Sequence, residues 1–182
     1  ALRGPLNEPV LIHSYAEFER TFGGLWLESS LGYAVNAFFL NGGQDAIIVR
    51  LFRPISSPAG KASLALKGGG STTTLEAASP GAWGNRLCAR VAAVDERSSQ
   101  QLADPLGVNQ TDLFTLTIYD AVSGMMETFP NLTVVPSPRR LDRVLEQESA
   151  LVRVAGELGQ DARRPDFHPA PAPGKKWWQD PA

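Results

Sequence analysis

Histidine and cysteine, which carry much of the acid–base, nucleophilic and metal chemistry of proteins, are scarce in this sequence. It has two histidines, His13 and His168, and one cysteine, Cys88. The histidines lie far apart and have no carboxylates at a ligand-like spacing, so the sequence predicts no metal site. His13 stands just before an expected helix start, where packing against Phe18 is favoured over the alternative of a catalytic base.

Other catalytic patterns are missing or misplaced. No serine lies in a G-x-S-x-G segment, and Cys88 falls in an alternating apolar stretch, where a thiol usually behaves as a small hydrophobe. The glycine run at 67–72 lacks the residue order of a P-loop and precedes a strand-like segment, which predicts a hairpin turn. Glu146 and Glu148 are two apart on an expected helix and point to different faces. We therefore expect no enzyme activity and no cofactor.

The charge balance and hydropathy exclude two classes of partner. Lysine and arginine total 17 against 19 acidic residues, a net charge of -2, which leaves no excess of cations for a phosphate backbone. The longest apolar runs, 34–40 and 46–52, are far shorter than the ~20 residues of a membrane span. We expect neither a nucleic-acid partner nor a membrane partner.

The first third of the chain predicts a strand, two helices and a second strand. A short apolar strand is expected at residues 10–12, followed by a capping box in which Ser14 and Glu17 open a helix at Tyr15. The second helix begins near Ser29 or Ser30 and carries a broad stripe that we expect to be buried: Leu31, Ala34, Val35, Phe38 and Phe39. The nearly continuous apolar run 46–52 predicts a central strand covered on both faces.

The composition of the sequence changes beyond Arg53, where proline, serine and glycine become frequent. Short strands are expected at 62–67, 72–78, 86–94, 113–119 and 126–135, and the turn residues at 96–104 predict a loop. Ser137 and Pro138 are expected to open a helix near 138–148, and residues 150–154 fit either the end of this helix or a strand. The predicted class is α+β: a strand-helix-helix-strand portion at 1–56, then a small antiparallel β-rich lobe at 57–158.

Two surface features are candidates for an interface. Arg139, Arg140 and Arg143 could form a basic stripe for an acidic partner, although an ordinary exposed face is the favoured interpretation. The proline-rich tail at 159–182 is expected to be extended, and its Trp177 and Trp178 are costly to leave in water. These tryptophans could dock on the lobe, on another part of the protein or on a neighbouring subunit.

Several short segments together resemble the sheath proteins of contractile tails, a family that includes phage tail sheaths, tailocins and extracellular contractile injection systems. The first block comprises GPLNEPVLI (4–12), SYAEF (14–18), FGG (22–24), LGYAV (31–35), FFLNGG (38–43) and IVR (48–50). The segment ASPGAWGN (78–85) resembles the start of the family's inserted domain, and 127–132 and 149–154 resemble its later parts. The blocks follow the family order across roughly residues 3–154.

The resemblance implies that residues 1–56 are the α/β part of a sheath core domain and 57–158 the inserted domain, so the chain corresponds to the N-terminal and inserted portion of a subunit. It also implies a homo-oligomer of stacked helical rings around an inner tube protein, which regions beyond those in this chain contact. Such a sheath belongs to a bacteriophage virion or contractile tail particle assembled in the bacterial cytoplasm, and contracts to drive the tube through a target envelope. Contraction between two lattice arrangements needs no catalytic group.

The 78–85 segment also has a plain structural interpretation. Gly81 and the pair Gly84-Asn85 predict two turns, with Trp83 packed between them over the end of a sheet. A rival interpretation of the whole chain is a non-enzymatic surface adhesion or carbohydrate-binding module, in which Trp177 and Trp178 stack on sugars.

Overall fold

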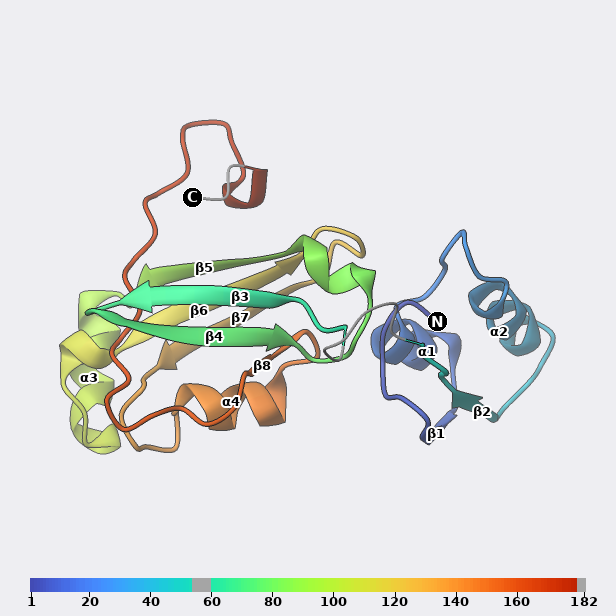
Figure 1. Cartoon of the computed structure of the whole chain (residues 1–182), viewed down its shortest axis with the longest axis horizontal. Coiled ribbons are helices and arrows are strands. Elements are labelled where there is room, and N and C mark those ends of the chain that lie inside the picture. Colours follow the sequence, from blue (N-terminus) through green and yellow to red (C-terminus); the bar gives the residue numbers. More distant parts are fainter. Residues whose placement is uncertain (54–59, 180–182) are drawn as a thin grey trace. The chain divides into compact units, whose positions relative to one another are not determined.

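The computed structural model describes residues 1–53 and 60–179, and it consists of two compact units. The first unit comprises Ala1–Ala62 and Ala78–Gly84, and the second comprises Ser63–Ala77 and Asn85–Ala182. The described residues form four α-helices and three small antiparallel sheets (Figure 1), so the predicted α+β class is confirmed. The boundary expected at 56/57 lies outside the described residues. Residues 78–84, expected in the inserted lobe, belong with the first unit.

The first unit has the predicted order of strand, helix, helix and strand. Strand β1 (Pro9–Ile12) pairs antiparallel with β2 (Ala46–Val49), and α1 (Tyr15–Phe22) and α2 (Leu31–Leu40) lie between them in the chain. The Ser14 hydroxyl caps α1 by accepting a hydrogen bond from the Glu17 N–H. The Glu17 carboxylate accepts from the N–H of His13, one residue earlier than a standard capping box requires.

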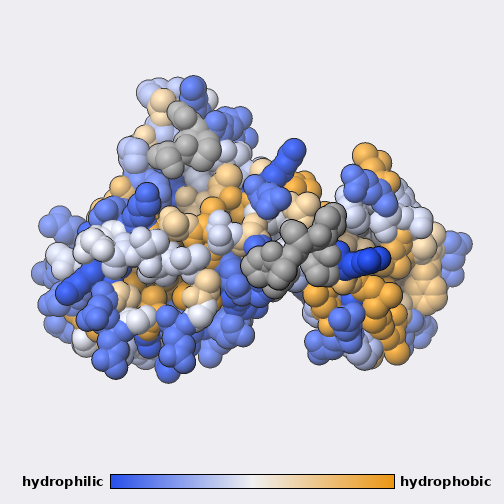
Figure 2. Space-filling model, in the orientation of Figure 1, coloured by the Kyte–Doolittle hydropathy of each residue, from blue (hydrophilic) through white to orange (hydrophobic). Residues whose placement is uncertain are grey.

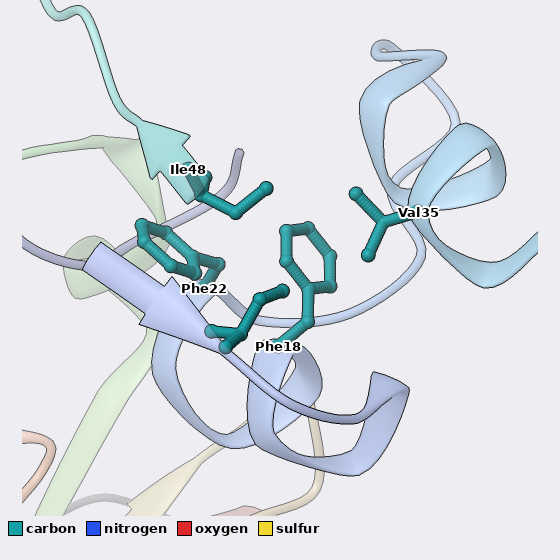
Figure 3. Close-up of a cluster of buried hydrophobic side chains, with 5 residues drawn as sticks. Phe18, Phe22, Val35 and Ile48 are labelled. Atoms are coloured by element: carbon teal, nitrogen blue, oxygen red, sulfur yellow. The ribbon is translucent and has the colours of Figure 1, made fainter. Parts of the chain in front are cut away.

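The core of the first unit is small. It consists of Ile12, Phe18, Phe22, Val35 and Ile48, and the two phenylalanine rings stack with centroids 5.4 Å apart (Figure 3). The expectation that β2 is a central strand covered on both faces is wrong, because among the described strands β2 pairs with β1 alone and Ile47 is 67% exposed. The broad buried stripe of α2 is also wrong, because Phe38 is exposed and Val35 is the one apolar side chain of the helix that is fully buried.

The second unit is built from two three-stranded antiparallel sheets. One has the order β3 (Ser63–Gly68), β4 (Ser71–Ala77) and β8 (Val152–Val154), and the other β5 (Leu87–Ala93), β6 (Phe114–Asp120) and β7 (Met126–Leu132). Gly69 and Gly70 both have positive φ and close the tight β3–β4 turn, as the glycine run predicts. The larger buried side chains of this unit include Leu66, Leu75, Val91, Leu113, Phe114, Leu116, Ile118, Leu132, Leu141 and Leu145.

The helices of the second unit depart from the sequence prediction in two places. Helix α3 (Glu96–Leu106) occupies the stretch expected to be a loop; Asp95 caps it by accepting from the Ser98 N–H, and Gly107 ends it in the left-handed conformation. Helix α4 (Leu141–Glu148) buries the expected stripe but starts at Leu141, whereas Ser137 stabilises only the turn before it. Residues 152–154 are a strand, which resolves the ambiguity at 150–154.

The tail after residue 158 is irregular until the short 3-10 turn η3 (Trp177–Gln179), in line with its proline content. Its backbone is nevertheless fixed to two strands. The Asp166 N–H donates to the Lys67 carbonyl of β3, and the His168 N–H donates to the Val91 carbonyl of β5. The Val91 N–H in turn donates a hydrogen bond to His168 Nδ1 at 2.9 Å. The tail therefore occupies part of the free edges of β3 and β5.

Candidate functional site

The most densely connected polar group of the first unit is the guanidinium of Arg50, which follows directly after β2. It is 4% exposed and donates hydrogen bonds to four backbone carbonyls: those of Ala1, Leu2, Gly4 and Pro80, at 2.7–3.3 Å. Burial lowers the pKa of Arg50 from its ordinary value. Because all the acceptors named are main-chain groups, Arg50 ties three chain segments together rather than binding a single charged partner.

Trp83 packs beside Arg50 within the same unit, on the short 3-10 turn η1 (Ala82–Arg86). The indole is 2% exposed and its Nε1–H donates to the Ser79 carbonyl at 3.2 Å. A Cβ built on Gly81, whose φ is +139°, would lie 2.9 Å from Trp83 Cδ1 and 3.2 Å from Arg50 Nη2. Gly81 is therefore required both by its backbone conformation and by the close approach of these two side chains.

The N-terminal segment completes this arrangement, which we call the Arg50–Trp83 cluster. The Gly4 N–H donates to the Ser79 hydroxyl at 3.0 Å, and the Arg3 guanidinium lies 5.9 Å from the centre of the Trp83 ring. The cluster thus brings together three separate segments singled out in the sequence, 4–12, 48–50 and 78–85. The predicted packed role of Trp83 agrees with this geometry, whereas the role of Arg50 was missed. The sequence signal that could have identified Arg50 is its position as a single charged residue directly after an apolar strand.

The remaining residues of the 78–85 motif have simpler positions. The Gly84 N–H donates to the Gly81 carbonyl and closes the turn around the indole. Asn85 is exposed and is the first residue of the second unit's longer segment.

The first unit also carries most of the exposed apolar surface of the described residues. Nine of the twelve exposed large hydrophobic side chains lie in it, and hydrophobic residues spread widely over this unit in Figure 2. They are Leu11, Leu25, Leu27, Tyr33, Phe38, Leu40, Ile47, Val49 and Leu51. Ile47 and Val49 share one face of β2 with Leu11 opposite Ile47 on β1, so this face of the small sheet is uncovered. This face is therefore a candidate interaction surface.

The three arginines proposed as a basic stripe do not form one continuous face. Arg139 pairs with Glu148 at 3.0 Å and donates to the Pro130 carbonyl. Arg140 donates to the Leu158 carbonyl at 2.6 Å and lies 3.5 Å from Asp142. Both residues precede α4, and Arg143, within the helix, is exposed. Arg139 and Arg140 therefore tie neighbouring segments of the second unit together.

Trp177 and Trp178 dock on the second unit, one of the three locations considered from the sequence. The Trp178 ring stacks on Tyr119 of β6 with centroids 4.2 Å apart, and Trp177 meets the same ring edge-on at 6.4 Å. The Lys176 ammonium lies 5.2 Å from the Trp178 ring centre. Both indoles are half-buried, so much of the aromatic surface that a sugar would use is already covered.

The histidines and the cysteine have structural surroundings. His13 is not the partly buried residue expected to pack against Phe18, because its side chain is 62% exposed and its Nδ1 lies 2.6 Å from Asp45 Oδ1. His168 accepts the Val91 N–H, and burial raises the pKa of the Cys88 thiol. Within 1–53 and 60–179, no group of three or more potential ligands is placed to hold a metal ion. No helix in the same ranges is long and apolar enough to cross a bilayer.

Neither the protein-family models nor the curated protein sequences contain a match to this chain.

Proposed function

We propose that this chain is a structural portion of a contractile tail sheath subunit, which polymerises around an inner tube and contracts to drive the tube through a target envelope. The observation that carries the proposal is the exposed apolar surface of the first unit. Side chains patterned for burial on α2 and β2 face solvent, as expected for a surface that other polypeptide covers in an assembly.

The Arg50–Trp83 cluster supports the same proposal through the resemblance. Three of the segments that resemble sheath proteins, far apart in the sequence, supply the carbonyls, the cation and the indole of this one cluster. Residues brought together in this way share one structural role. We interpret the cluster as the joint that fixes residues 79–83 to the N-terminal segment and to the end of β2 within the first unit.

In the proposed assembly, the free energy of contraction comes from the difference between two sets of subunit interfaces. The partners are other copies of the subunit in a helical stack of rings and an inner tube protein, and the particle is a phage virion or a related contractile tail assembled in the bacterial cytoplasm. Exposed apolar side chains such as Ile47 and Leu51 would be covered by the remainder of the subunit or by a neighbour.

Immunogold labelling of the native product tests the proposal. Antibodies raised against this chain should label striated tubes along their whole length in negative-stain micrographs, on both long and contracted particles. Antibodies pre-absorbed with the purified chain provide the control. Labelling confined to the cell surface, or antigen found solely in non-particulate fractions, would contradict the proposal.

A substitution in the native gene tests whether the exposed apolar face of β2 takes part in tube assembly. Ile47→Asp should abolish tube formation, because it places a charge on the uncovered face of β2. Val122→Asp introduces the same charge at an exposed apolar position of the second unit and should leave the tubes intact. Normal tubes from Ile47→Asp would show that this face is not an assembly surface.

A further inference from the structure

A cavity of about 450 Å³ lies within the second unit, beside the edges of β3 and β5 and beneath the tail. Its apolar lining includes Leu66 and Leu87, both buried, and also Trp177. The volume falls within the ~300–1,000 Å³ typical of ligand sites. None of the functions considered above uses this cavity.

The backbone of β5 presents unpaired groups to the cavity. In an antiparallel ladder, successive residues direct their N–H and C=O alternately toward one neighbouring strand and the other. Val91 directs both groups away from β6, since His168 bonds to both of them. Ala89, two residues earlier, must face the same edge, and it lines the cavity beyond the point where the tail leaves the strand. No described residue pairs with its backbone groups.

Among the described residues, the charged groups around the cavity all have one sign. Arg86, Arg90 and Lys175 line it, together with His168, and none of the described carboxylates does so. The Nε–H of Arg90 is buried and has no hydrogen-bond partner among the described residues, whereas its Nη2 reaches the Pro169 carbonyl at 3.5 Å. A buried donor without an acceptor costs free energy unless a ligand supplies one. An anionic ligand satisfies both the charge and the unpaired donor.

The two faces of β5 differ in chemistry, and this difference determines which side chains an added strand could carry. Leu87 and Val91 face the apolar interior, while Cys88 and Arg90 alternate with them toward the opposite face. A chain that pairs with this edge would direct every second side chain toward the interior and the intervening ones toward the cations. The edge therefore suits alternation of apolar and acidic residues.

We propose that the cavity binds an acidic peptide in extended conformation, which adds as a strand at Ala89 on the free edge of β5 and directs carboxylates to Arg86, Arg90 and Lys175. Main-chain hydrogen bonds supply affinity in this mode of recognition, and the cationic side chains select the sequence. The site lies wholly within the second unit and does not depend on the proposed sheath function.

Titration calorimetry with defined peptides tests the proposal. An acetylated and amidated hexapeptide of alternating valine and glutamate should bind saturably at 1:1 stoichiometry, and more weakly as salt is raised. Replacing its glutamates by glutamine should weaken binding at least tenfold, and replacing its valines by proline should abolish binding because the backbone donors are lost. Equal affinity for the glutamine or the proline peptide, equal affinity for free glutamate, or no saturation with the first peptide would overturn the proposal.

Variants of the full chain locate the site. Lys175→Gln and Arg90→Gln should each raise the Kd of the glutamate peptide about fivefold, the upper range for a solvent-accessible ion pair. Lys175 is exposed, so its replacement does not threaten the fold. Arg97→Gln, which removes the same charge from the exposed side of α3 and does not line the cavity, should leave the Kd unchanged. An unchanged Kd in both cavity variants would overturn the proposal.

Discussion

The two units of this chain treat apolar side chains differently. In the second unit, alternation along β6 translates directly into burial, with Phe114, Leu116 and Ile118 inside and the intervening residues half-exposed. In the first unit, β2 and α2 are just as apolar, yet Ile47 and Phe38 face solvent. An apolar pattern therefore indicates that a side chain is suited to burial. It does not indicate whether the same chain or another polypeptide covers that side chain.

The units also differ in what holds their segments together. The second unit uses two three-stranded sheets of backbone pairs, whereas the two-stranded sheet of the first unit is supplemented by the buried guanidinium of Arg50, which binds four carbonyls. A two-stranded sheet has little stability of its own. The first unit should therefore depend on a few residues, and the second on many.

Trp83→Ala should have the largest effect on stability. Removing a fully buried indole costs about 3–5 kcal/mol, and the loss should fall on the first unit, to which Trp83 belongs. Hydrogen exchange should show lost protection in α1 and β1 with β6 still protected. Trp177→Ala, at a half-buried site, provides the control. An unchanged urea midpoint for Trp83→Ala would show that the ring contributes little and that the two units do not differ in this way.

Arg50→Met should have the next largest effect, about 2–3 kcal/mol, because it preserves much of the apolar stem but leaves carbonyls without their charged donor. Chemical denaturation of the purified variant measures the change. Arg143→Met, at an exposed arginine of α4, should shift stability by less than about 0.5 kcal/mol. Equal effects of the two substitutions would contradict the special role of Arg50.

Polar substitution on the uncovered sheet face should leave stability almost unchanged while altering the surface. Ile47→Thr combined with Val49→Thr retains β-branched side chains, so we expect a change within about 1 kcal/mol. Binding of the dye ANS, which reports exposed apolar surface, should fall clearly. Met126→Thr in the second unit serves as the comparison and should reduce the dye signal less. A large loss of stability in the double variant would place these residues in a core.

The smallest effect concerns Cys88, the single thiol, in the second unit. Burial raises its pKa, so the folded chain should contain less thiolate at pH 8 and react with iodoacetamide more slowly than the chain in urea. The difference should narrow as pH rises. Because the folded pKa is the higher one, the stability that this thiol contributes is present below its unfolded pKa and is lost as pH rises through the folded pKa. Equal rates for folded and unfolded chains at pH 8 would contradict this.

Local signals in the sequence predicted those elements that local interactions define. The Ser14 cap and Gly23 bound α1 as expected, and the alternation at β5 and β6 marked both strands. Helix α3 was not predicted because its many polar residues leave too few apolar positions to show a helical period. Asp95 and Gly107, which mark its two ends, were nevertheless present in the sequence. The helix α4 starts later than predicted because Ser137 closes the preceding turn and Arg140 still has an extended backbone.

The candidate sites were less predictable because they depend on distant segments. Periodicity can identify Trp83 as a packed residue, but nothing local indicates that Arg50 reaches the carbonyl of Pro80, thirty positions away. The exposed face of β2 was predicted to be buried for a related reason: a pattern specifies an apolar environment without specifying which polypeptide provides it. The cavity beside β5 likewise depends on where the tail leaves that strand.

The order in which segments alternate between the units has a consequence for synthesis on the ribosome. The β3–β4 hairpin belongs to the second unit but is made before residues 78–84, which complete the first unit. Ala77 of β4 cannot pair until Val152 of β8 has been synthesised, and this pairing is among the most distant in the described sequence. Pairings of this separation form slowly, and an unpaired strand edge is prone to aggregate. When residues 1–84 have been made, the chain thus holds every residue of the first unit together with a hairpin whose β4 edge has no partner strand yet.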